Sequence, residues 1–262
     1  DRRGHAERPA LARLDRQPFE DIGLERRTAR RKHFDDSSAA EFGFQDQFLA
    51  VAEQWNLMPA LTRYVIEHAL RDCAEIRRNG SALRVAVNIS ARNLTEPDLV
   101  QSIGHLLAAQ GLPPTLLEIE LTETTIMANP TLATSVIARL RDMGIRIAID
   151  DFGTGHSSLA YLTTLAVDEL KIDRSFVHTM TTDPTAETIV RAIVDLGRNL
   201  HLDVVAEGIE TTATEHALHQ MGCTYGQGYL FSRPAPAPVL SQWLTGYPLE
   251  QAARQPIPEP AQ

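Results

Sequence analysis

Short apolar runs alternate with longer amphipathic segments from about residue 46 onward. Runs rich in β-branched and small apolar residues predict six strands, at 83–87, 116–121, 145–149, 169–172, 202–206 and 225–230. Apolar residues spaced three and four apart predict helices at 97–109, 130–143, 157–165, 186–200, 211–221 and 235–244. Two more helices are expected before the first strand, a short one near 48–55 and a longer one from about 61 to 80.

Strands that alternate with helices predict βαβ units and a parallel sheet, which is the α/β class. Right-handed crossovers would curl six such units into most of a (β/α) barrel, and 262 residues suit one barrel of about 250. A full barrel needs two more strands, which the sequence before residue 46 does not visibly supply. We therefore expect an irregular, disordered segment at 1–45, a barrel domain at 46–246 that is incomplete or irregular at its N-terminus, and a disordered tail at 247–262.

Charge is divided unevenly along the chain. The net charge is −9, but the first 36 residues hold ten Lys and Arg against eight acids, so they carry about +2 and the remainder about −11. The N-terminal segment can be disordered or can act as a basic interaction arm, although its interspersed acids dilute the charge. The acidic total argues against a protein that binds nucleic-acid polymers.

Compartment signals are few. No apolar run approaches the roughly 20 residues of a membrane span, and the N-terminus lacks the apolar core of a signal peptide. Cys73 and Cys223 have no metal-ligand spacing and suggest buried thiols in a reducing compartment. We therefore expect a cytoplasmic location.

The stretch Ile147–Gly155 joins a buried type of strand to Asp150 and Asp151 and then to a Gly-rich turn. Parallel sheets and barrels place their chemistry at the C-terminal ends of strands. Adjacent carboxylates repel each other unless a cation lies between them, so the pair indicates a divalent metal. Taken alone, the pair also fits a solvated strand end with an Asx turn.

The other predicted strands also end in polar side chains that can bind a metal, a proton or a phosphate. The complete series is Asn88, Glu120, Asp150 with Asp151, Lys171, Glu207 and Gln227. Buried strand ends otherwise finish in turn-forming residues rather than in Glu or Lys. The pattern predicts a rim of oxygen ligands at the C-terminal mouth of the barrel.

The donors at this rim are carboxylate and amide oxygens, with no His or Cys, which favours Mg²⁺ or Mn²⁺ over zinc. Several carboxylates suggest two ions, which can clamp the attacking and leaving oxygens of a phosphoester displacement. Lys171 can orient the nucleophilic water or stabilise charge in the transition state, or it can form a buried ion pair with Asp150 or Asp151.

One rim carboxylate and two carboxylates near the rim have further expected roles. Glu207 is the best spare carboxylate for a general base. Glu123 and Glu210 each lie three residues beyond a rim residue. We expect them to brace loops through backbone N–H groups rather than to touch the substrate.

These motifs, in this order and spacing, resemble the EAL-domain cyclic di-GMP phosphodiesterases. The matching stretches are Asn88–Ser90, Glu120–Glu123, Asp150–Gly155, Lys171–Asp173, Glu207–Glu210, Gln227–Tyr229 and Leu230–Pro234. The resemblance runs from about Phe48 to Leu244. It implies a modified TIM barrel, two Mg²⁺ or Mn²⁺ ions, and hydrolysis of cyclic di-GMP to linear pGpG in bacterial signalling.

The resemblance also implies residue roles. The metal ligands would be Asn88, Glu120, Asp150 and Asp151. Lys171 and Glu207 would position or activate water, Gln227 and Glu210 would support the site, and Glu123 would order the loop at Phe152–Gly155. Family members dimerise near that loop, so a homodimer is implied, and fused or partner diguanylate cyclase (GGDEF) or sensor domains are possible.

The N-terminus departs from the family pattern. The family opens with a Tyr-Gln-Pro strand and a Glu-Ala-Leu strand whose Glu is a metal ligand, and neither motif is present. The nearest echo is Pro9–Leu14, with Pro9 in place of the Glu, and Glu7 is a poor substitute. One hypothesis is that residues 1–45 are foreign sequence, which would weaken metal binding and expose a barrel edge.

Three functions remain open at this point. The first is an active cyclic di-GMP phosphodiesterase, supported by the intact remainder of the site. The second is a degenerate, noncatalytic cyclic di-GMP receptor or regulatory domain, suggested by the missing Glu. The third is an unrelated metal-dependent barrel enzyme, such as a lyase or a sugar-phosphate enzyme, which the full motif set disfavours.

Overall fold

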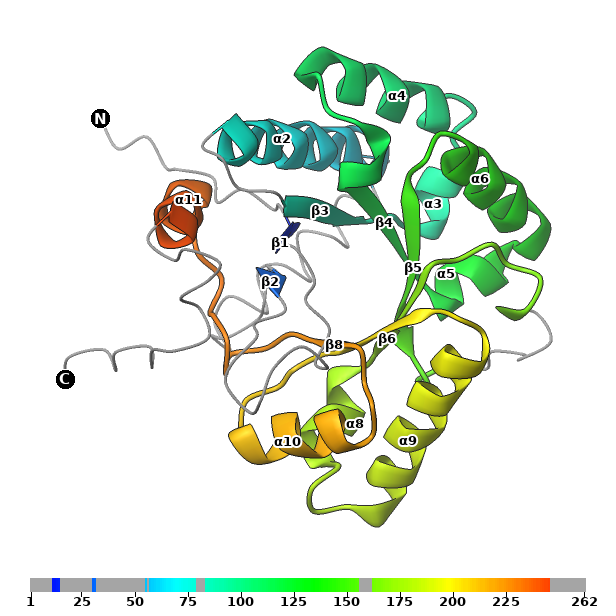
Figure 1. The fold of residues 1–262 in the computed structure, drawn as a ribbon. Helices are drawn as coiled ribbons and strands as arrows, with labels where there is room; N and C mark the ends of the chain where they lie inside the picture. The colour runs from blue at the N-terminus through cyan, green and yellow to red at the C-terminus, as the bar shows by residue number, and fades with distance from the viewer. Residues whose placement is uncertain are drawn as a thin grey trace.

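The computed structural model describes residues 11–14, 30–31, 55, 57–78, 83–155 and 162–245 of the chain. Its centre is one curled, eight-stranded sheet with helices around the outside (Figure 1). The strand order is β2-β1-β3-β4-β5-β6-β7-β8. The predicted α/β class and barrel-like parallel sheet are therefore confirmed.

Six parallel strands follow one another in chain order, as successive βαβ crossovers require. They are β3 (Leu83–Asn88), β4 (Leu117–Thr122), β5 (Arg146–Phe152), β6 (Glu169–Ile172), β7 (Asp203–Ala206) and β8 (Tyr225–Gly226). Parallel strands end on the same side of the sheet, so their C-terminal residues form one rim.

Two short strands extend the sheet beyond β3. β1 (Leu11–Leu14) pairs antiparallel with β3, and β2 (Arg30–Arg31) pairs antiparallel with β1. The sequence analysis missed both strands because runs of four and two residues are too short to show a period of two. β1 coincides with most of the Pro9–Leu14 stretch that echoes the missing Glu-Ala-Leu motif.

Helices lie along the outside of the sheet (Figure 1). The long ones are α2 (Met58–Arg78), α4 (Leu99–Gln110), α6 (Pro130–Asp142), α9 (Pro184–Asn199), α10 (Thr212–Gln220) and α11 (Ala237–Thr245). The short ones, which periodicity did not reveal, are α3 (Ala91–Leu94), α5 (Glu123–Ala128), α8 (Arg174–Thr179) and the 3-10 turn η2 (Pro114–Leu116).

Polar caps begin two of these short helices directly at the rim. Thr122 is the last residue of β4, and its side chain accepts a hydrogen bond from Thr125 N–H at the start of α5. Asp173 follows β6 and caps α8 by accepting from Ser175 N–H. Side-chain caps satisfy donors that a helix leaves unpaired. The chain therefore turns sharply at these strand ends and holds the neighbouring rim residues in place.

Three predicted elements need correction or lie mostly outside the described part. The strand expected at 225–230 is only Tyr225–Gly226, and residues 227–231 form a turn in which Phe231 N–H donates to Gly228 O. A Cβ at Gly228 would collide with the backbone of Ile209, so only glycine fits this close backbone crossing, where strand pairing ends. Most of the helices predicted at 157–165 and 48–55 falls outside the described residues.

Charged side chains fill part of the barrel interior. Glu118 and Glu120 on β4, and Glu169 and Lys171 on β6, are each 0% exposed. Residues two apart on a strand point to the same face, so each pair faces inward. Glu118 and Glu169 lie near the N-terminal ends of their strands, which form the floor of the barrel. Glu120 and Lys171 lie toward the C-terminal ends, at the mouth of the barrel.

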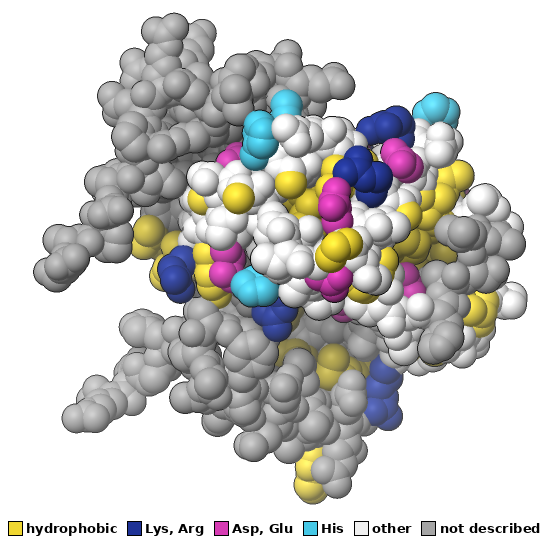
Figure 2. All heavy atoms as spheres, turned by 90° about the horizontal axis from the view of Figure 1, so that it is seen from below, with side chains coloured by type: hydrophobic (Ala, Val, Ile, Leu, Met, Phe, Trp, Pro, Cys, Tyr) yellow, Lys and Arg dark blue, Asp and Glu magenta, His cyan; other side chains and the backbone are white. Residues whose placement is uncertain are grey.

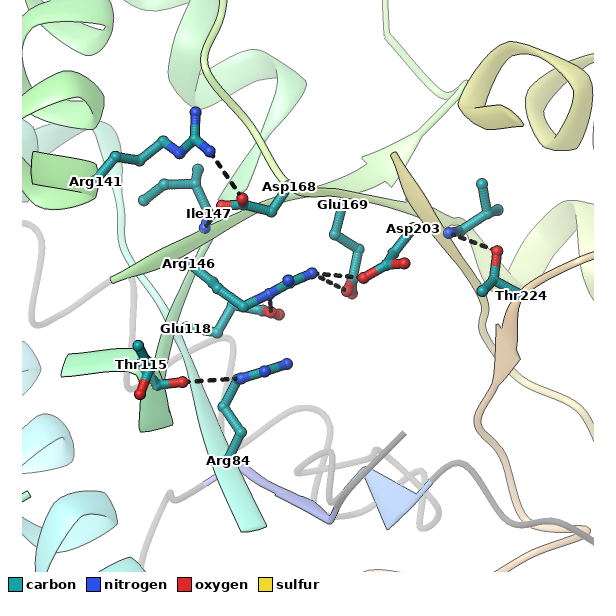
Figure 3. Close-up of polar contacts among 11 residues, drawn as sticks. Arg84, Thr115, Glu118, Arg141, Arg146, Ile147, Asp168, Glu169, Asp203 and Thr224 are labelled. Carbon is teal, nitrogen blue, oxygen red and sulfur yellow. Dashed lines mark hydrogen bonds and ion pairs between the residues drawn. The ribbon is translucent and has the colours of Figure 1, made fainter. Parts of the chain in front are cut away.

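At the floor, Arg146 joins the N-terminal ends of four consecutive strands (Figure 3). It lies at the start of β5, and its guanidinium is 3.4 Å from Glu118, 3.9 Å from Glu169 and 2.6 Å from Asp203. These acids come from β4, β6 and β7. One forked cation therefore ties the strands together at the end opposite the rim.

Within the described residues, none of the helices is both long enough and apolar enough to cross a membrane. Seen from below, where α8, α9 and α10 lie in Figure 1, the described surface carries acidic and basic side chains side by side (Figure 2). Proteins that track nucleic-acid backbones instead present a continuous basic stripe.

Candidate active site

The rim residues predicted from the sequence come from successive strands. Asn88 ends β3, Glu120 lies in β4, and Asp150 and Asp151 lie near the end of β5. Lys171 lies in β6, whereas Glu207 and Gln227 directly follow β7 and β8. Asn88 is paired in register with Glu120, and Thr122 with Asp150.

Lys171 stands at the centre of the site. Its ammonium is fully buried and lies 3.1 Å from Glu120 Oε2 and 2.6 Å from Glu207 Oε1, and it also contacts Asp150 Oδ1. The ion pair with Asp150 is one of the two that the sequence analysis considered. Three carboxylates around one ammonium leave an excess of negative charge, which favours a further cation at this mouth.

Asp151 adds a fourth carboxylate to this mouth. Oxygens of Asp150, Asp151 and Glu207 lie within 4.8 Å of one another. The pKa of Asp151 is raised from 3.8 to about 7, chiefly by burial and then by repulsion from Asp150 and Glu207, while Lys171 opposes the rise. The raised pKa of Asp151 therefore indicates that several carboxylates crowd together at a partly buried position.

The backbone of β5 breaks its register at the same point. The pairing of β5 with β6 is irregular between Ile149 and Phe152, and Asp151 has a left-handed φ of 53°. An irregularity of this kind turns a side chain away from the ordinary alternation of a strand. It allows two consecutive residues, Asp150 and Asp151, to contribute to one cluster.

The cluster fits a hard divalent cation. Its donors are carboxylate oxygens from β5 and from the residue after β7, with no sulfur or imidazole. A cation held there would relieve the repulsion that raises the pKa of Asp151. The metal dependence expected from the sequence therefore agrees with the donor chemistry of the site.

Gln227 orients Glu207. Its side-chain Nε2 donates to Glu207 Oε1 at 2.9 Å, and both side chains are buried. Lys171 contacts the same oxygen, so two groups set the orientation of this carboxylate. The backbone supports the arrangement, since Gln227 N–H donates to Ala206 O at 2.8 Å.

The two outlying glutamates differ. Glu123, at the first position of α5, is 4% exposed, and its Oε1 accepts a hydrogen bond from Gly153 N–H at 2.9 Å. The sequence analysis expected Glu123 to contact a loop through backbone N–H groups, and its ordering role stays a prediction. Glu210 is exposed, three residues beyond Glu207 in the loop that leads to α10. Asn88 is also exposed, at the edge of the mouth.

Sequence reasoning gave no role to Asp173. This residue lies two positions after Lys171, and its charge contributes to the raised pKa of Asp151. Its spacing was the available signal, because residues two apart on an extended segment share a face. Asn93 was missed as well, although Ser90 and Asn93 have the spacing of a capping box.

The family model of the EAL domain matches residues 28–234. The chain belongs to the EAL domain family. The match begins at residue 28, ahead of Phe48, where the motif resemblance starts, so it covers part of the segment that the sequence analysis treated as unlike the family. It covers all the rim residues described above.

Curated relatives are similar to most of this chain. The signaling protein YkoW of Bacillus subtilis is 41% identical over 202 residues, which cover 77% of this chain and 25% of the relative. Cyclic di-GMP phosphodiesterase NbdA of Pseudomonas aeruginosa is 41% identical over 208 residues, covering 79% and 27%. The chain thus spans about a quarter of the length of the curated relatives it matches.

A solved structure agrees with the fold. The PaMucR phosphodiesterase in complex with c-di-GMP is 35% identical, with a TM-score of 0.75 over 88% of this chain and 93% of that one. The barrel described here is therefore the fold of an EAL domain.

Proposed function

We propose that this domain is a metal-dependent phosphodiesterase that hydrolyses cyclic di-GMP to linear pGpG in bacterial second-messenger signalling. The observation that carries the proposal is the buried Lys171 among Glu120, Asp150 and Glu207 at the barrel mouth. The family match and the relative named as a cyclic di-GMP phosphodiesterase support the choice of substrate.

In this proposal Asn88, Glu120, Asp150 and Asp151 hold the metal. Oxygen donors of this kind suit Mg²⁺ or Mn²⁺, and we propose two ions. When bound, such ions lower the pKa of a coordinated water and stabilise negative charge on the phosphate oxygens. The repulsion that raises the pKa of Asp151 is the local feature that a cation would relieve.

Lys171 and Glu207 act on the water and the phosphate. The Glu207 carboxylate is held by Lys171 at 2.6 Å and by Gln227 at 2.9 Å, which suits a group that must accept a proton in a defined direction. The Lys171 ammonium supplies positive charge at the place where the phosphate gains negative charge, so it stabilises the transition state. Glu123 holds the loop after β5 through Gly153 N–H.

Noncatalytic binding of cyclic di-GMP is the second candidate. One observation favours it: the Glu-Ala-Leu motif is missing, and Pro9 stands where its Glu would be. A rim that lacks one acidic ligand can still hold a nucleotide through the remaining groups. This candidate predicts binding of cyclic di-GMP without turnover.

Hydrolysis by the purified chain separates the two candidates. Cyclic di-GMP is incubated with protein and Mg²⁺ or Mn²⁺, and the products are resolved by chromatography, with a metal-chelated sample as control. Formation of pGpG that stops with the chelator, and that Glu207→Gln abolishes, supports the phosphodiesterase. Binding in a calorimeter without any pGpG supports the receptor, and neither binding nor turnover contradicts both.

Three finer expectations belong to the same proposal. We infer a homodimer formed near the Phe152–Gly155 loop, in which residues 153–155 are exposed. We also infer that fused or partner diguanylate cyclase or sensor domains regulate the site, because the curated relatives are about three times as long. A cytoplasmic location follows from an intracellular second messenger.

A further inference from the structure

The side chain of Asn93 is a buried polar hub beside the mouth of the barrel. Asn93 is 0% exposed, and its Oδ1 accepts from Thr62 Oγ1 at 3.0 Å, Ser90 N at 3.1 Å and Ser90 Oγ at 2.7 Å. Its Nδ2 donates to Glu96 at 2.8 Å. Both ends of the carboxamide are therefore used, and the hub links α2, the turn after β3 and the segment after α3.

The turn that this hub holds begins at Asn88. Ile89 N–H donates to Glu120 O at 2.9 Å, and the Ile89 side chain is buried, so one end of the turn is attached to β4. Ser90, the next residue, is attached to Asn93 through both its backbone and its hydroxyl. Asn88 is itself exposed, so its place at the mouth depends on these backbone attachments.

The chemistry of the hub requires an amide. Two hydroxyls and one N–H meet at Oδ1, so this atom must be an acceptor, whereas the atom facing Glu96 must be a donor. An Asp at position 93 would set a second carboxylate against Glu96. A Leu would leave the donors of Ser90 and Thr62 without their acceptor at this position, which destabilises the turn.

We propose that Asn93 is a positioning residue that holds Asn88 at the mouth for binding of a divalent cation. The inference rests on the proposed function, in which Asn88 is a metal ligand. Thr62 extends the same hold to α2, whose residues 62, 66, 69 and 70 are buried against the barrel. Groups that orient a ligand from behind commonly change metal affinity by 10- to 100-fold when removed.

The test is a titration of the purified chain with Mn²⁺, in which electron paramagnetic resonance measures the free ion. Asn93→Ala is expected to weaken Mn²⁺ binding about tenfold, and Asn88→Ala at least as much. The matched control is Asn129→Ala, which removes the Asn N-cap of α6, where Asn129 Oδ1 accepts from Leu132 N. This control is expected to leave Mn²⁺ binding unchanged.

A double variant shows whether Asn93 acts through Asn88. If it does, adding Asn93→Ala to Asn88→Ala causes little further loss of Mn²⁺ affinity. In the metal-free protein, hydrogen exchange at the amides of residues 89–93 should also quicken in Asn93→Ala.

Three results would overturn the inference. The first is Mn²⁺ affinity of Asn93→Ala equal to that of Asn129→Ala. The second is an additive loss in the double variant, which indicates general weakening of the fold. The third is an unchanged Mn²⁺ affinity in the single variant Asn88→Ala. This result contradicts the proposed ligand set itself, because residue 93 is intact in that variant.

Thr62→Val keeps the test decisive if Asn93→Ala does not fold. It removes one donor to Asn93 Oδ1 and preserves the shape of the side chain. A severalfold loss of Mn²⁺ affinity that disappears in the Asn88→Ala background supports the hub. An unchanged Mn²⁺ affinity in Thr62→Val, together with faster hydrogen exchange at residues 89–93, counts against the proposal. It would show that the turn does not control Asn88 as a metal ligand.

Discussion

Lys171 brings one positive charge into a closed space with the carboxylates of Glu120, Asp150 and Glu207. All four side chains are at least nine-tenths buried, so water screens them little. Removing one member of a buried ionic group is costly because the remaining charges lose their counter-charge. In this site, a bound metal ion can restore that counter-charge.

Lys171→Met is therefore expected to destabilise the metal-free protein by about 3–5 kcal/mol in urea unfolding, and Mn²⁺ is expected to recover part of the loss. Arg191→Met is the control, because its ion pair with Glu187 is exposed on α9 and contributes no more than about 0.5 kcal/mol. A metal-free Lys171→Met protein as stable as the control would contradict this account of the site.

The carboxyl group of Asp151 makes metal binding depend on pH. Its pKa in the folded protein is about 7, raised from 3.8, chiefly by burial and then by Asp150 and Glu207. Between about pH 4 and pH 7 the folded protein holds a proton there that an unfolded chain has lost. The free energy of unfolding contributed by this group therefore falls as the pH rises from about 4 to 7, because the folded protein must give up this proton.

A metal ligand must lose its proton, so Mn²⁺ affinity is expected to rise about tenfold per pH unit below about pH 7 and to level off above it. Titrations between pH 5.5 and 8 measure this slope. Asp151→Asn should bind Mn²⁺ more weakly and with a flatter pH profile. A wild-type affinity that does not change between pH 5.5 and 7 would show that Asp151 does not compete for a proton with the ion.

At the scale of elements, the loop after β5 depends on the start of α5. Glu123 Oε1 accepts from Gly153 N–H, and Gly153 has a left-handed φ of 100°, which favours glycine. A Cβ on Gly155 would lie 2.3 Å from Glu123 Oε2. The two glycines therefore let the loop approach Glu123 closely.

Gly155→Ala is expected to push the loop away from Glu123 and to quicken hydrogen exchange at the Gly153 amide by about tenfold or more, since that amide loses its acceptor. Gly111→Ala is the control: its φ of 64° makes it a strained substitution, but no atom lies within 4 Å of its Cβ. Unchanged protection at Gly153 in Gly155→Ala would refute the role of this contact.

At the scale of the whole molecule, the barrel has two charged ends with different tasks. The mouth gathers Lys171 and the acids that can hold a metal, whereas the floor is closed by Arg146 with Glu118, Glu169 and Asp203 (Figure 3). In barrels of this type chemistry belongs to the C-terminal end, and the opposite end serves stability.

Arg146→Met is expected to lower the free energy of unfolding by about 3–5 kcal/mol, because Glu118 and Glu169 are fully buried and would lose their cation. Mn²⁺ affinity of the folded protein should remain within about twofold of wild type. Arg198→Met, at an exposed pair with Asp195, is the control for urea unfolding. A large change in Mn²⁺ affinity without loss of stability would contradict this division of the two ends.

Most of the architecture was accessible from the sequence. The six parallel strands were predicted because continuous β-branched runs separate amphipathic helices, and each of these six strands overlaps its prediction, whereas β1 and β2 were missed. The strand-end residues were predicted as one rim because parallel strands end on one side. The short helices α3, α5 and α8 were missed, since four to six residues show no full helical period.

The amino-acid sequence by itself thus determined the type of fold and the set of polar residues at the rim, because these follow from local periodicity and chain direction. Only the tertiary structure decided which of them meet. The Lys171 contacts join β4, β5, β6 and the end of β7, and Asn93 meets Thr62, 31 residues away. Such pairings depend on sheet register, on the irregularity at Asp151 and on packing between distant segments, and local sequence patterns do not encode these.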